Sequence, residues 1–324
     1  MTAEQRSQVS VVGAGEWGLA LAAAAARAGS ETVLFSRRGE VRPPKGVTLT
    51  KDLGVVARHA RLVVLTVPSN VARDVAHMLG DHISGRHLVV HGVRGLASVA
   101  DPSTNDGGKE LVTIADVVRA ETPAKRLGAL GGPALTADLL TGKPSVLVCG
   151  SAYEEVNRAL RAAFESRTLR LYPTQDLRGL EWASALVGCL ALGIGYAQAL
   201  DVSPGLVAAV ISRSMEEASR IAAAAGGEAR TLLGLAGYGD LLACIAQKER
   251  PEVRVGAALA QGAPIAKALA MAGARVEAVE LIPRIVAWTE HNAVRAPIFA
   301  SLQRLVRGET TRDEIIDNLM TFER

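Results

Sequence analysis

Residues 9–18, VSVVGAGEWG, constrain the fold more than any other part of the sequence. A short apolar run at residues 9–12 leads into a G-x-G-x-x-G pattern, and an alanine-rich stretch follows at residues 19–28. A second apolar run, residues 31–35, begins directly after Gly29-Ser30. The order of strand, glycine turn, helix and strand is that of a dinucleotide-binding βαβ unit. The alternative is a glycine-rich turn with a purely structural role.

Each glycine of the pattern has a physical task in such a unit. Gly13 permits the tight turn, Gly15 lets the backbone approach a pyrophosphate, and Gly18 lets helix and strand pack closely. The N–H groups at the start of the helix and its positive dipole end attract phosphates. The sequence therefore predicts a dinucleotide cofactor bound by these glycines and by the intervening Glu16 and Trp17.

The residues after the second apolar run favour NADP(H) over NAD(H). An NAD site of this type usually has an acidic residue there, which binds the ribose 2′-hydroxyl. This chain has Ser36, Arg37 and Arg38 instead, and no carboxylate precedes Glu40. A hydroxyl and two guanidinium groups suit a 2′-phosphate. NAD stays possible, because the arginines could equally be a solvated loop pair.

Composition excludes several other classes of protein. A chain of 324 residues suggests two domains, and 49% apolar residues provide for sizeable cores. A net charge of +3 is too small to argue for a nucleic-acid partner. The cysteines, Cys149, Cys189 and Cys244, lie far apart and are typical of buried thiols in a reducing compartment. We expect no signal peptide, membrane span or metal site, and a cytoplasmic location.

The first half of the chain alternates apolar runs with helical or loop segments. This βαβ rhythm predicts an α/β domain, a Rossmann-type doubly wound parallel sheet, over residues 1–175. Ligands in that architecture bind at the carboxyl ends of the strands, where residues 68–70, 92–95 and 131–133 fall. The polar segment 98–109 is interpreted as a mobile surface loop. The further strand-like runs are residues 62–67, 87–91, 126–130 and 145–149.

The second half, residues 176–324, is predicted to be entirely helical. Strand-like runs disappear, and residues 172–177 are interpreted as the hinge between the domains. Many apolar helix faces need partners, so we expect a large helix–helix core or a homodimer interface. The long apolar stretches are residues 179–199, 204–225, 253–260 and 276–290.

Several short motifs occur in a fixed order along nearly the whole chain. They are GAGEWG at 13–18, VPS at 67–69, GGP at 131–133, YPTQD at 172–176, GLAGYGDL at 234–241 and API at 296–298. Together they resemble the bacterial NAD(P)-dependent glycerol-3-phosphate dehydrogenase family. The resemblance implies a Rossmann domain followed by an all-α substrate domain of the 6-phosphogluconate-dehydrogenase type. It also places Pro68 and Glu277 among the cofactor-binding residues, and Gly132 near the substrate.

The chain departs from the family at the catalytic pair. The family reads E-x-x-x-x-x-K-N in its first substrate-domain helix, and its lysine protonates the carbonyl oxygen as hydride arrives. Counting six residues from Glu181 leads to Val187, which Gly188 follows. An isopropyl side chain cannot transfer a proton. The resemblance therefore implies that the family reaction is impaired or altered.

The anion-binding positions are altered as well. The family's T-K-G turn corresponds to residues 93–95, where Arg94 can hold an anion but is a poor proton donor. Its phosphate-binding R-N pair aligns without gaps with Pro251 and Glu252. A shift of one position places Arg250 in that role, whereas a carboxylate at Glu252 would repel a phosphomonoester.

Few residues are left for proton transfer. His91 closes a strand next to Arg94, and an imidazole suits proton transfer near neutral pH. The alternative is that His91 is a structural strand residue. Asp240 is retained from the family motif, either as a site residue or as the N-cap of the next helix, and Cys244 stands where the family has threonine. The candidate catalytic residues are therefore Arg94, Asp240 and His91.

Two functions follow from these observations. The first is an NADP-dependent oxidoreductase that transfers hydride between the nicotinamide and a small, anionic carbonyl or hydroxy substrate. The second is a non-catalytic NADP-binding protein with a regulatory or structural role. A scaffold that binds no cofactor is a third alternative.

Overall fold

The computed structural model describes residues 6–38, 40–100, 109–311 and 314. The chain divides into two compact units. The first unit comprises Met1–Ser98 and Val112–Glu181, and the second comprises Val99–Leu111 and Trp182–Arg324. The division falls between Glu181 and Trp182, inside a helix, rather than at the predicted residue 175.

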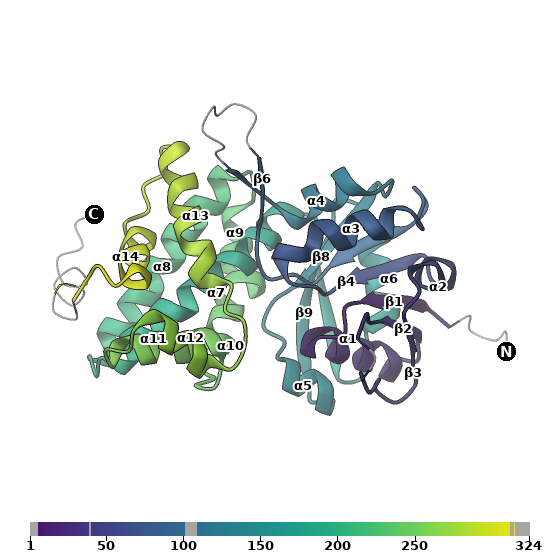
Figure 1. The fold of residues 1–324 in the computed structure, drawn as a ribbon, viewed down its shortest axis with the longest axis horizontal. Coiled ribbons are helices and arrows are strands. Elements are labelled where there is room, and N and C mark those ends of the chain that lie inside the picture. Colours follow the sequence, from purple (N-terminus) through teal and green to yellow (C-terminus); the bar gives the residue numbers. More distant parts are fainter. Residues whose placement is uncertain (1–5, 39, 101–108, 312–313, 315–324) are drawn as a thin grey trace. The chain divides into compact units, whose positions relative to one another are not determined.

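An eight-stranded sheet forms the centre of the first unit (Figure 1). The strand order is β10-β9-β8-β5-β4-β1-β2-β3, which is a doubly wound arrangement and confirms the predicted fold class. Its strands are β1 (Gln8–Val12), β2 (Glu31–Phe35), β3 (Val47–Thr50), β4 (Leu62–Leu65), β5 (Leu88–His91), β8 (Arg126–Gly131), β9 (Ser145–Gly150) and β10 (Leu169–Thr174).

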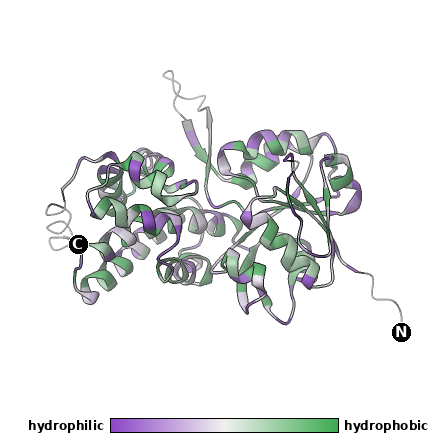
Figure 2. Cartoon of the chain, turned by 60° about the horizontal axis from the view of Figure 1, so that its bottom comes forward, coloured by the Kyte–Doolittle hydropathy of each residue, from purple (hydrophilic) through white to green (hydrophobic). Residues whose placement is uncertain are grey.

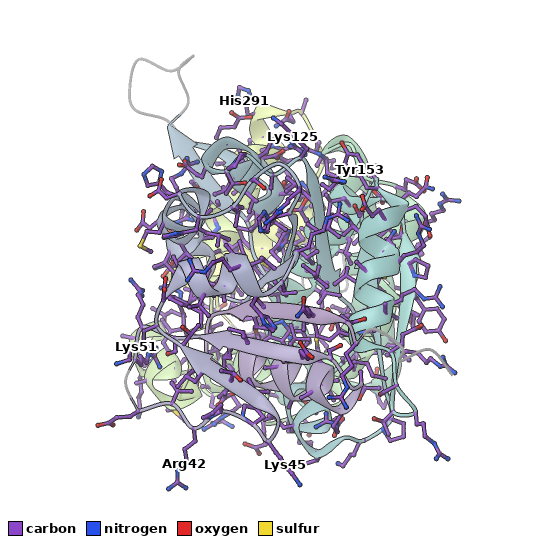
Figure 3. All side chains as sticks on the ribbon, turned by 90° about the vertical axis from the view of Figure 1, so that its right-hand side faces the viewer. Arg42, Lys45, Lys51, Lys125, Tyr153 and His291 are labelled. Carbon is purple, nitrogen blue, oxygen red and sulfur yellow. The ribbon has the colours of Figure 1, made fainter. Side chains whose placement is uncertain are left out.

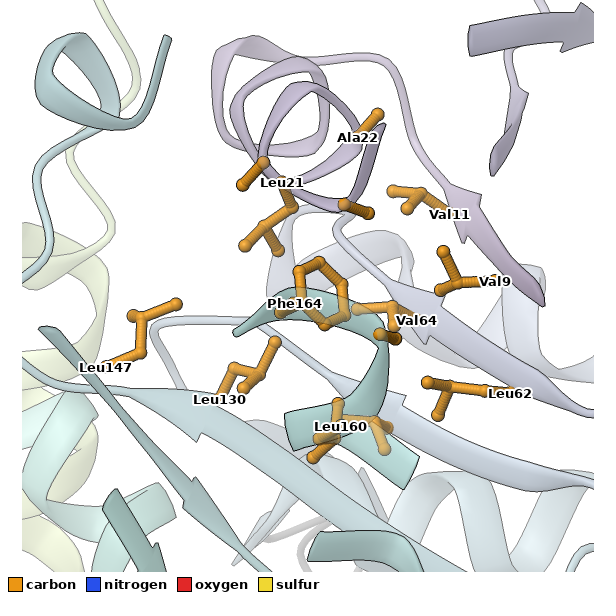
Figure 4. Packing of buried hydrophobic residues seen from close by; sticks show 14 of the residues in the cluster. Val9, Val11, Leu21, Ala22, Leu62, Val64, Leu130, Leu147, Leu160 and Phe164 are labelled. Carbon is orange, nitrogen blue, oxygen red and sulfur yellow. The ribbon is translucent and has the colours of Figure 1, made fainter. Parts of the chain in front are cut away.

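Helices cover both faces of this sheet, so the central strands are apolar on both sides. Figure 4 shows the packing on the face covered by α1 and α6, where Leu21 and Phe164 meet strand residues such as Val64. The other face packs against α2, α3 and α4. Figure 2 shows the resulting hydrophobic colouring of the strands. The helices are α1 (Glu16–Arg27), α2 (Leu53–His59), the 3-10 turn η1 (Ser69–Val71), α3 (Ala72–Gly80), α4 (Ile114–Glu121), α5 (Thr136–Thr141) and α6 (Glu154–Phe164).

The sheet differs from the prediction in two respects. Strands β8 and β9 are antiparallel, with Leu130 opposite Cys149, whereas the other strand pairs of the sheet are parallel. Strands β3 and β10 were not predicted, and β10 takes up part of the proposed hinge at residues 172–177. Strand β10 lies at an edge of the sheet, where Pro173 is tolerated because its missing N–H is not needed by a neighbour.

Part of the predicted surface loop at residues 98–109 is a strand pair. Strands β6 (Ala97–Ala100) and β7 (Lys109–Val112) form a two-stranded sheet of their own. The rest of the predicted loop, residues 101–108, lies outside the described part of the chain.

The second unit is built on helices, as predicted. Helix α7 starts in the first unit and continues as the core helix of the second, where Trp182 packs against Trp288 with ring centroids 4.8 Å apart and the ring planes tilted by 50°. In the described chain it is the one helix long and apolar enough to cross a membrane, and 94% of its apolar window is buried, as in a core helix. The helices are α7 (Leu177–Ala199), α8 (Pro204–Ala224), α9 (Ala229–Leu233), the π-helix η2 (Leu235–Gly239), α10 (Asp240–Ile245), α11 (Pro251–Ala260), α12 (Ile265–Ala272), α13 (Ala278–His291) and α14 (Pro297–Arg307).

Candidate functional site

The glycine turn between β1 and α1 is held by close backbone packing. Gly13 has a φ of 115°, and the Thr66 hydroxyl donates to its carbonyl oxygen over 2.8 Å. A Cβ built on Gly18 would lie 1.8 Å from that same carbonyl oxygen. Both positions therefore require glycine for the turn itself to form.

Gly15 is different, because its neighbourhood is open. It is exposed, has an ordinary φ of −74° and precedes the first residue of α1. A Cβ at this position would meet no atom within 4 Å. The first helical hydrogen bond runs from the Leu19 N–H to the Gly15 carbonyl, so the N–H groups of Glu16, Trp17 and Gly18 have no acceptor within the helix. An open glycine beside free helix N–H groups fits a dinucleotide pyrophosphate.

The end of β2 presents a hydroxyl and two guanidinium groups. Ser36 is buried, and its Oγ accepts the Arg38 backbone N–H over 3.1 Å. Arg37 and Arg38 are exposed, and neither guanidinium forms an ion pair with a carboxylate of the described chain. The arrangement fits an anion next to the adenosine ribose.

The turns after β4, β5 and β8 lie at the same edge of the sheet as the glycine turn, because these strands run parallel to β1. Pro68 is exposed and leads into η1, Arg94 is half-buried after β5, and Gly132 is buried with a φ of 94° after β8. Trp17 lies against the β5 turn, since a Cβ on Gly92 would come within 2.6 Å of its Nε1. The structure thus gathers the candidate residues of the first unit at one edge.

His91 is enclosed rather than open to a ligand. Its side chain is 3% exposed, and its Nε2 lies 2.8 Å from Oε1 of Glu181. Its Nδ1 accepts the Val93 backbone N–H over 3.4 Å. The ring has no nitrogen available to a substrate, which argues against the predicted role of His91 as a proton donor.

In the second unit, the two positions at which the sequence resemblance predicts the family's catalytic pair are occupied by a valine and a glycine. Val187 is fully buried within α7, and Gly188 follows it. Asp240 is also fully buried, and its carboxylate accepts the Cys244 thiol over 3.3 Å. Asp240 is not an N-cap, because the π-helix η2 runs into α10 and Gly239 already has helical φ and ψ.

The anion-binding candidate Arg250 is engaged in an internal ion pair. Its Nε lies 3.1 Å from Oε2 of Glu252, and the two side chains are only 13% and 15% exposed. Burial, followed by the negative charge of Glu252, raises the pKa of the Cys189 thiol on α7. Glu277 is half-buried just before α13 and belongs to the same unit.

Two features of these sites were not predicted from the sequence. Glu181 was noted only as a landmark, yet it is a buried carboxylate in a helix that is otherwise almost free of charge. That isolation is the signal that could have revealed it, because a buried charge needs partners. The pairing of Arg250 with Glu252 has no such signal, since residues two apart do not face each other on a helix. It arises because Arg250 precedes α11 and Glu252 lies in its first turn.

Comparison with known proteins places this chain in a family. Residues 39–157 match the family described as NAD-dependent glycerol-3-phosphate dehydrogenase N-terminus, and residues 176–317 match its C-terminus. Two similar proteins are glycerol-3-phosphate dehydrogenases [NAD(P)+], both 30% identical. The one from Halorhodospira halophila aligns over 97% of this chain and 96% of its own, and the one from Gluconobacter oxydans over 95% of each.

Solved structures share the fold. The crystal structure of glycerol-3-phosphate dehydrogenase from Coxiella burnetii superposes with a TM-score of 0.87 at 22% identity, covering 98% of this chain and 99% of its own. A ketopantoate reductase from Ralstonia eutropha has a TM-score of 0.56 at 18% identity, covering 97% and 99%. With the family matches spanning most of both units, the chain belongs to the NAD-dependent glycerol-3-phosphate dehydrogenase family of oxidoreductases.

Proposed function

We propose that this protein is an NADP(H)-dependent oxidoreductase that acts on a small anionic carbonyl or hydroxy substrate and reduces dihydroxyacetone phosphate poorly. The observation that carries the proposal is the ion pair between Arg250 and Glu252. An arginine whose charge is already neutralised by a fixed carboxylate is a poor ligand for a phosphomonoester, because a second anion must displace or adjoin the first.

The first unit supplies the groups for the cofactor. Gly15 leaves space for the pyrophosphate, and the start of α1 offers N–H donors. NADP is favoured over NAD by Arg37 and Arg38, and Figure 3 shows that Arg42 and Lys45 of the following loop also extend outward. Bound nicotinamide supplies or accepts a hydride at C4, and the chain's own residues bind and orient the reactants.

The substrate's negative charge is assigned to Arg94. It follows β5 at the edge of the sheet that carries the cofactor residues, and a guanidinium stays charged throughout the physiological pH range. The same property makes it unsuitable as a proton donor. With Val187 apolar and both nitrogens of His91 bonded, we assign the proton of the carbonyl oxygen to water.

A second candidate function is an NADP-binding protein without turnover. The burial of Val187 supports it, since the position that the sequence resemblance assigns to the family's lysine then holds no titratable side chain. Such a protein would bind NADP(H) but would not transfer a hydride.

Oxidation of NADPH by concentrated protein tests the proposal. Dihydroxyacetone phosphate is compared with pyruvate, a small carbonyl compound that bears a carboxylate, and NADH serves as the alternative cofactor. The proposal expects faster turnover with pyruvate, or a related 2-oxo acid, than with dihydroxyacetone phosphate. Fast reduction of dihydroxyacetone phosphate would contradict it. NADPH binding without turnover of any small carbonyl compound would favour the second candidate.

We further propose that the protein is a cytoplasmic homodimer. Exposed apolar side chains on α9, η2 and α10 support an interface there, namely Leu233, Tyr238 and Leu242. Light scattering during size-exclusion chromatography, on the wild type and on Leu242→Glu, tests the oligomeric state.

A further inference from the structure

One carboxylate oxygen joins three elements inside the first unit. Oε1 of Glu181, in the first turns of α7, lies 2.8 Å from Nε2 of His91, the last residue of β5. The same oxygen accepts the backbone N–H of Ala115, in the first turn of α4, also over 2.8 Å. The side chains of His91 and Glu181 are 3% and 2% exposed, so water does not compete for these bonds.

The hydrogen-bond pattern assigns the hydrogen on the imidazole. Nδ1 of His91 accepts the N–H of Val93, so Nε2 carries the hydrogen and donates it to Glu181. The ring thus links the Glu181 carboxylate to the backbone of the turn that follows β5. A buried carboxylate is tolerated only while its hydrogen-bond donors stay in place, so breaking this link costs much free energy.

The turn held in this way carries Arg94. At its start, Gly92 bonds through its N–H to the Leu65 carbonyl over 2.8 Å, and the indole of Trp17 lies against it. At its next residue, Val93 bonds to the His91 ring. The position of Arg94 therefore depends on contacts with the glycine turn on one side and with the His91–Glu181 pair on the other.

We propose that His91 and Glu181 form a positioning pair that fixes residues 92–95, and through them Arg94, relative to the cofactor-binding turn. The pair acts through the backbone and contacts neither substrate nor cofactor. The consequence for substrate binding rests on the proposed role of Arg94, whereas the effect on the turn does not.

Hydrogen exchange of the wild type and three variants, followed by mass spectrometry on peptides covering residues 88–98, tests the proposal. Glu181→Ala removes the acceptor, and His91→Leu removes the link to Val93. Either is expected to speed exchange of the amides of residues 93–95 by about tenfold or more, as expected for loss of a hydrogen bond to a charged group. Glu181→Gln keeps an oxygen that can accept both bonds, so it is expected to retain most of the protection.

Arg178→Ala is the matched control. Arg178 also joins α7 to α4, through an ion pair with Asp116 at 3.2 Å, and its side-chain hydrogen bonds within the described chain go to Asp116 rather than to the turn after β5. Its loss is expected to leave exchange at residues 93–95 unchanged. Equal deprotection in Arg178→Ala and Glu181→Ala would show that general docking of α7 is responsible and would overturn the proposal.

A kinetic readout separates positioning from chemistry. With a substrate that turns over, His91→Leu and Glu181→Ala are expected to raise the substrate KM more than they lower kcat. Rescue of KM by Glu181→Gln supports positioning by hydrogen bonds, whereas loss of kcat in that variant would point to a role for the charge and overturn the proposal. If the protein turns over no substrate, the proposed function fails, while the exchange data still decide on the positioning pair.

Discussion

Replacing Glu252 by glutamine is the sharpest perturbation of the candidate substrate site. The change keeps the size of the side chain and an oxygen that can accept from Arg250, but it removes the negative charge. At the observed separation of 3.1 Å, two unit charges attract by about 5 kcal/mol for an effective dielectric constant of about 20. Each side chain keeps a small exposed fraction, so we expect the net loss of folding stability to be about 1–3 kcal/mol, below the range for a fully buried pair.

In Glu252→Gln the guanidinium of Arg250 is no longer neutralised, and we expect it to bind anions. A new hydrogen bond between Arg250 and a phosphate contributes about 1.5–3 kcal/mol, which corresponds to roughly 10- to 100-fold tighter binding. Isothermal titration with glycerol 3-phosphate at low ionic strength measures this gain directly. It does not depend on whether the protein turns over any substrate.

Glu249→Gln is the control for this experiment. Glu249 is exposed, lies next to Arg250 in sequence and loses the same unit of charge. A general increase in positive charge affects both variants alike, whereas the release of Arg250 affects only Glu252→Gln. Glycerol 3-phosphate binding by the wild type as tight as by Glu252→Gln, or equal gains in the two variants, would refute the reasoning.

Three further outcomes are expected. Gly18→Ala disrupts the turn and lowers both the melting temperature and the NADPH affinity. Gly15→Ala weakens NADPH binding as well but lowers the melting temperature far less, because its Cβ meets no atom and only the N-cap is weakened; melting curves and fluorescence titration measure the two effects. The pKa of the Glu217 carboxyl is raised because burial outweighs the opposite effect of two backbone N–H donors of α14. Its contribution to stability is then largest below the unfolded pKa of about 4.5 and declines as the pH rises through the folded value. Glu217→Gln is therefore expected to gain stability relative to the wild type as the pH rises above about 4.5, and a relative fall in its melting temperature with rising pH contradicts this. The double change Val187→Lys and Gly188→Asn is expected to give no reduction of dihydroxyacetone phosphate by itself, measured as NADPH oxidation, because Glu252 still neutralises Arg250, the candidate for binding the phosphate.

The parts of the fold that the sequence predicted are those fixed by backbone chemistry and by continuous apolar runs. The run at residues 62–67 consists of leucine and β-branched residues, and β4 occupies most of it. The direction of β9 was not predictable, because a buried strand is apolar whether it runs parallel or antiparallel to its neighbour. Strand β10 alternates buried Leu169 and Leu171 with exposed Arg170 and Tyr172, but residues 172–177 were interpreted as the hinge between the domains.

The candidate site was predictable in its cofactor half and much less so in its substrate half. Glycine positions report a backbone geometry, and that geometry is local to a dozen residues. The roles of His91, Glu181 and Glu252 depend instead on which side chains meet after folding. His91 and Glu181 are separated by 90 residues and meet only because α7 begins against the end of β5. No sequence pattern indicates that two side chains so far apart in the chain form a hydrogen bond.

The glycines of the fingerprint are unequal as evidence for a cofactor. Gly13 and Gly18 are demanded by the turn itself, since side chains there collide with backbone atoms of the same turn or of the residue after β4. They would be needed in a protein of this fold that had lost its cofactor. Gly15 has an ordinary backbone conformation and empty space beside it, and at this N-cap position Ser, Thr, Asp or Asn could cap α1 with a side-chain hydrogen bond that glycine lacks. No contact among the described residues explains the absence of such a side chain, whereas a phosphate approaching the backbone does. Among the three glycines, Gly15 is therefore the one that argues for a bound dinucleotide, and hence against a purely structural role for the turn.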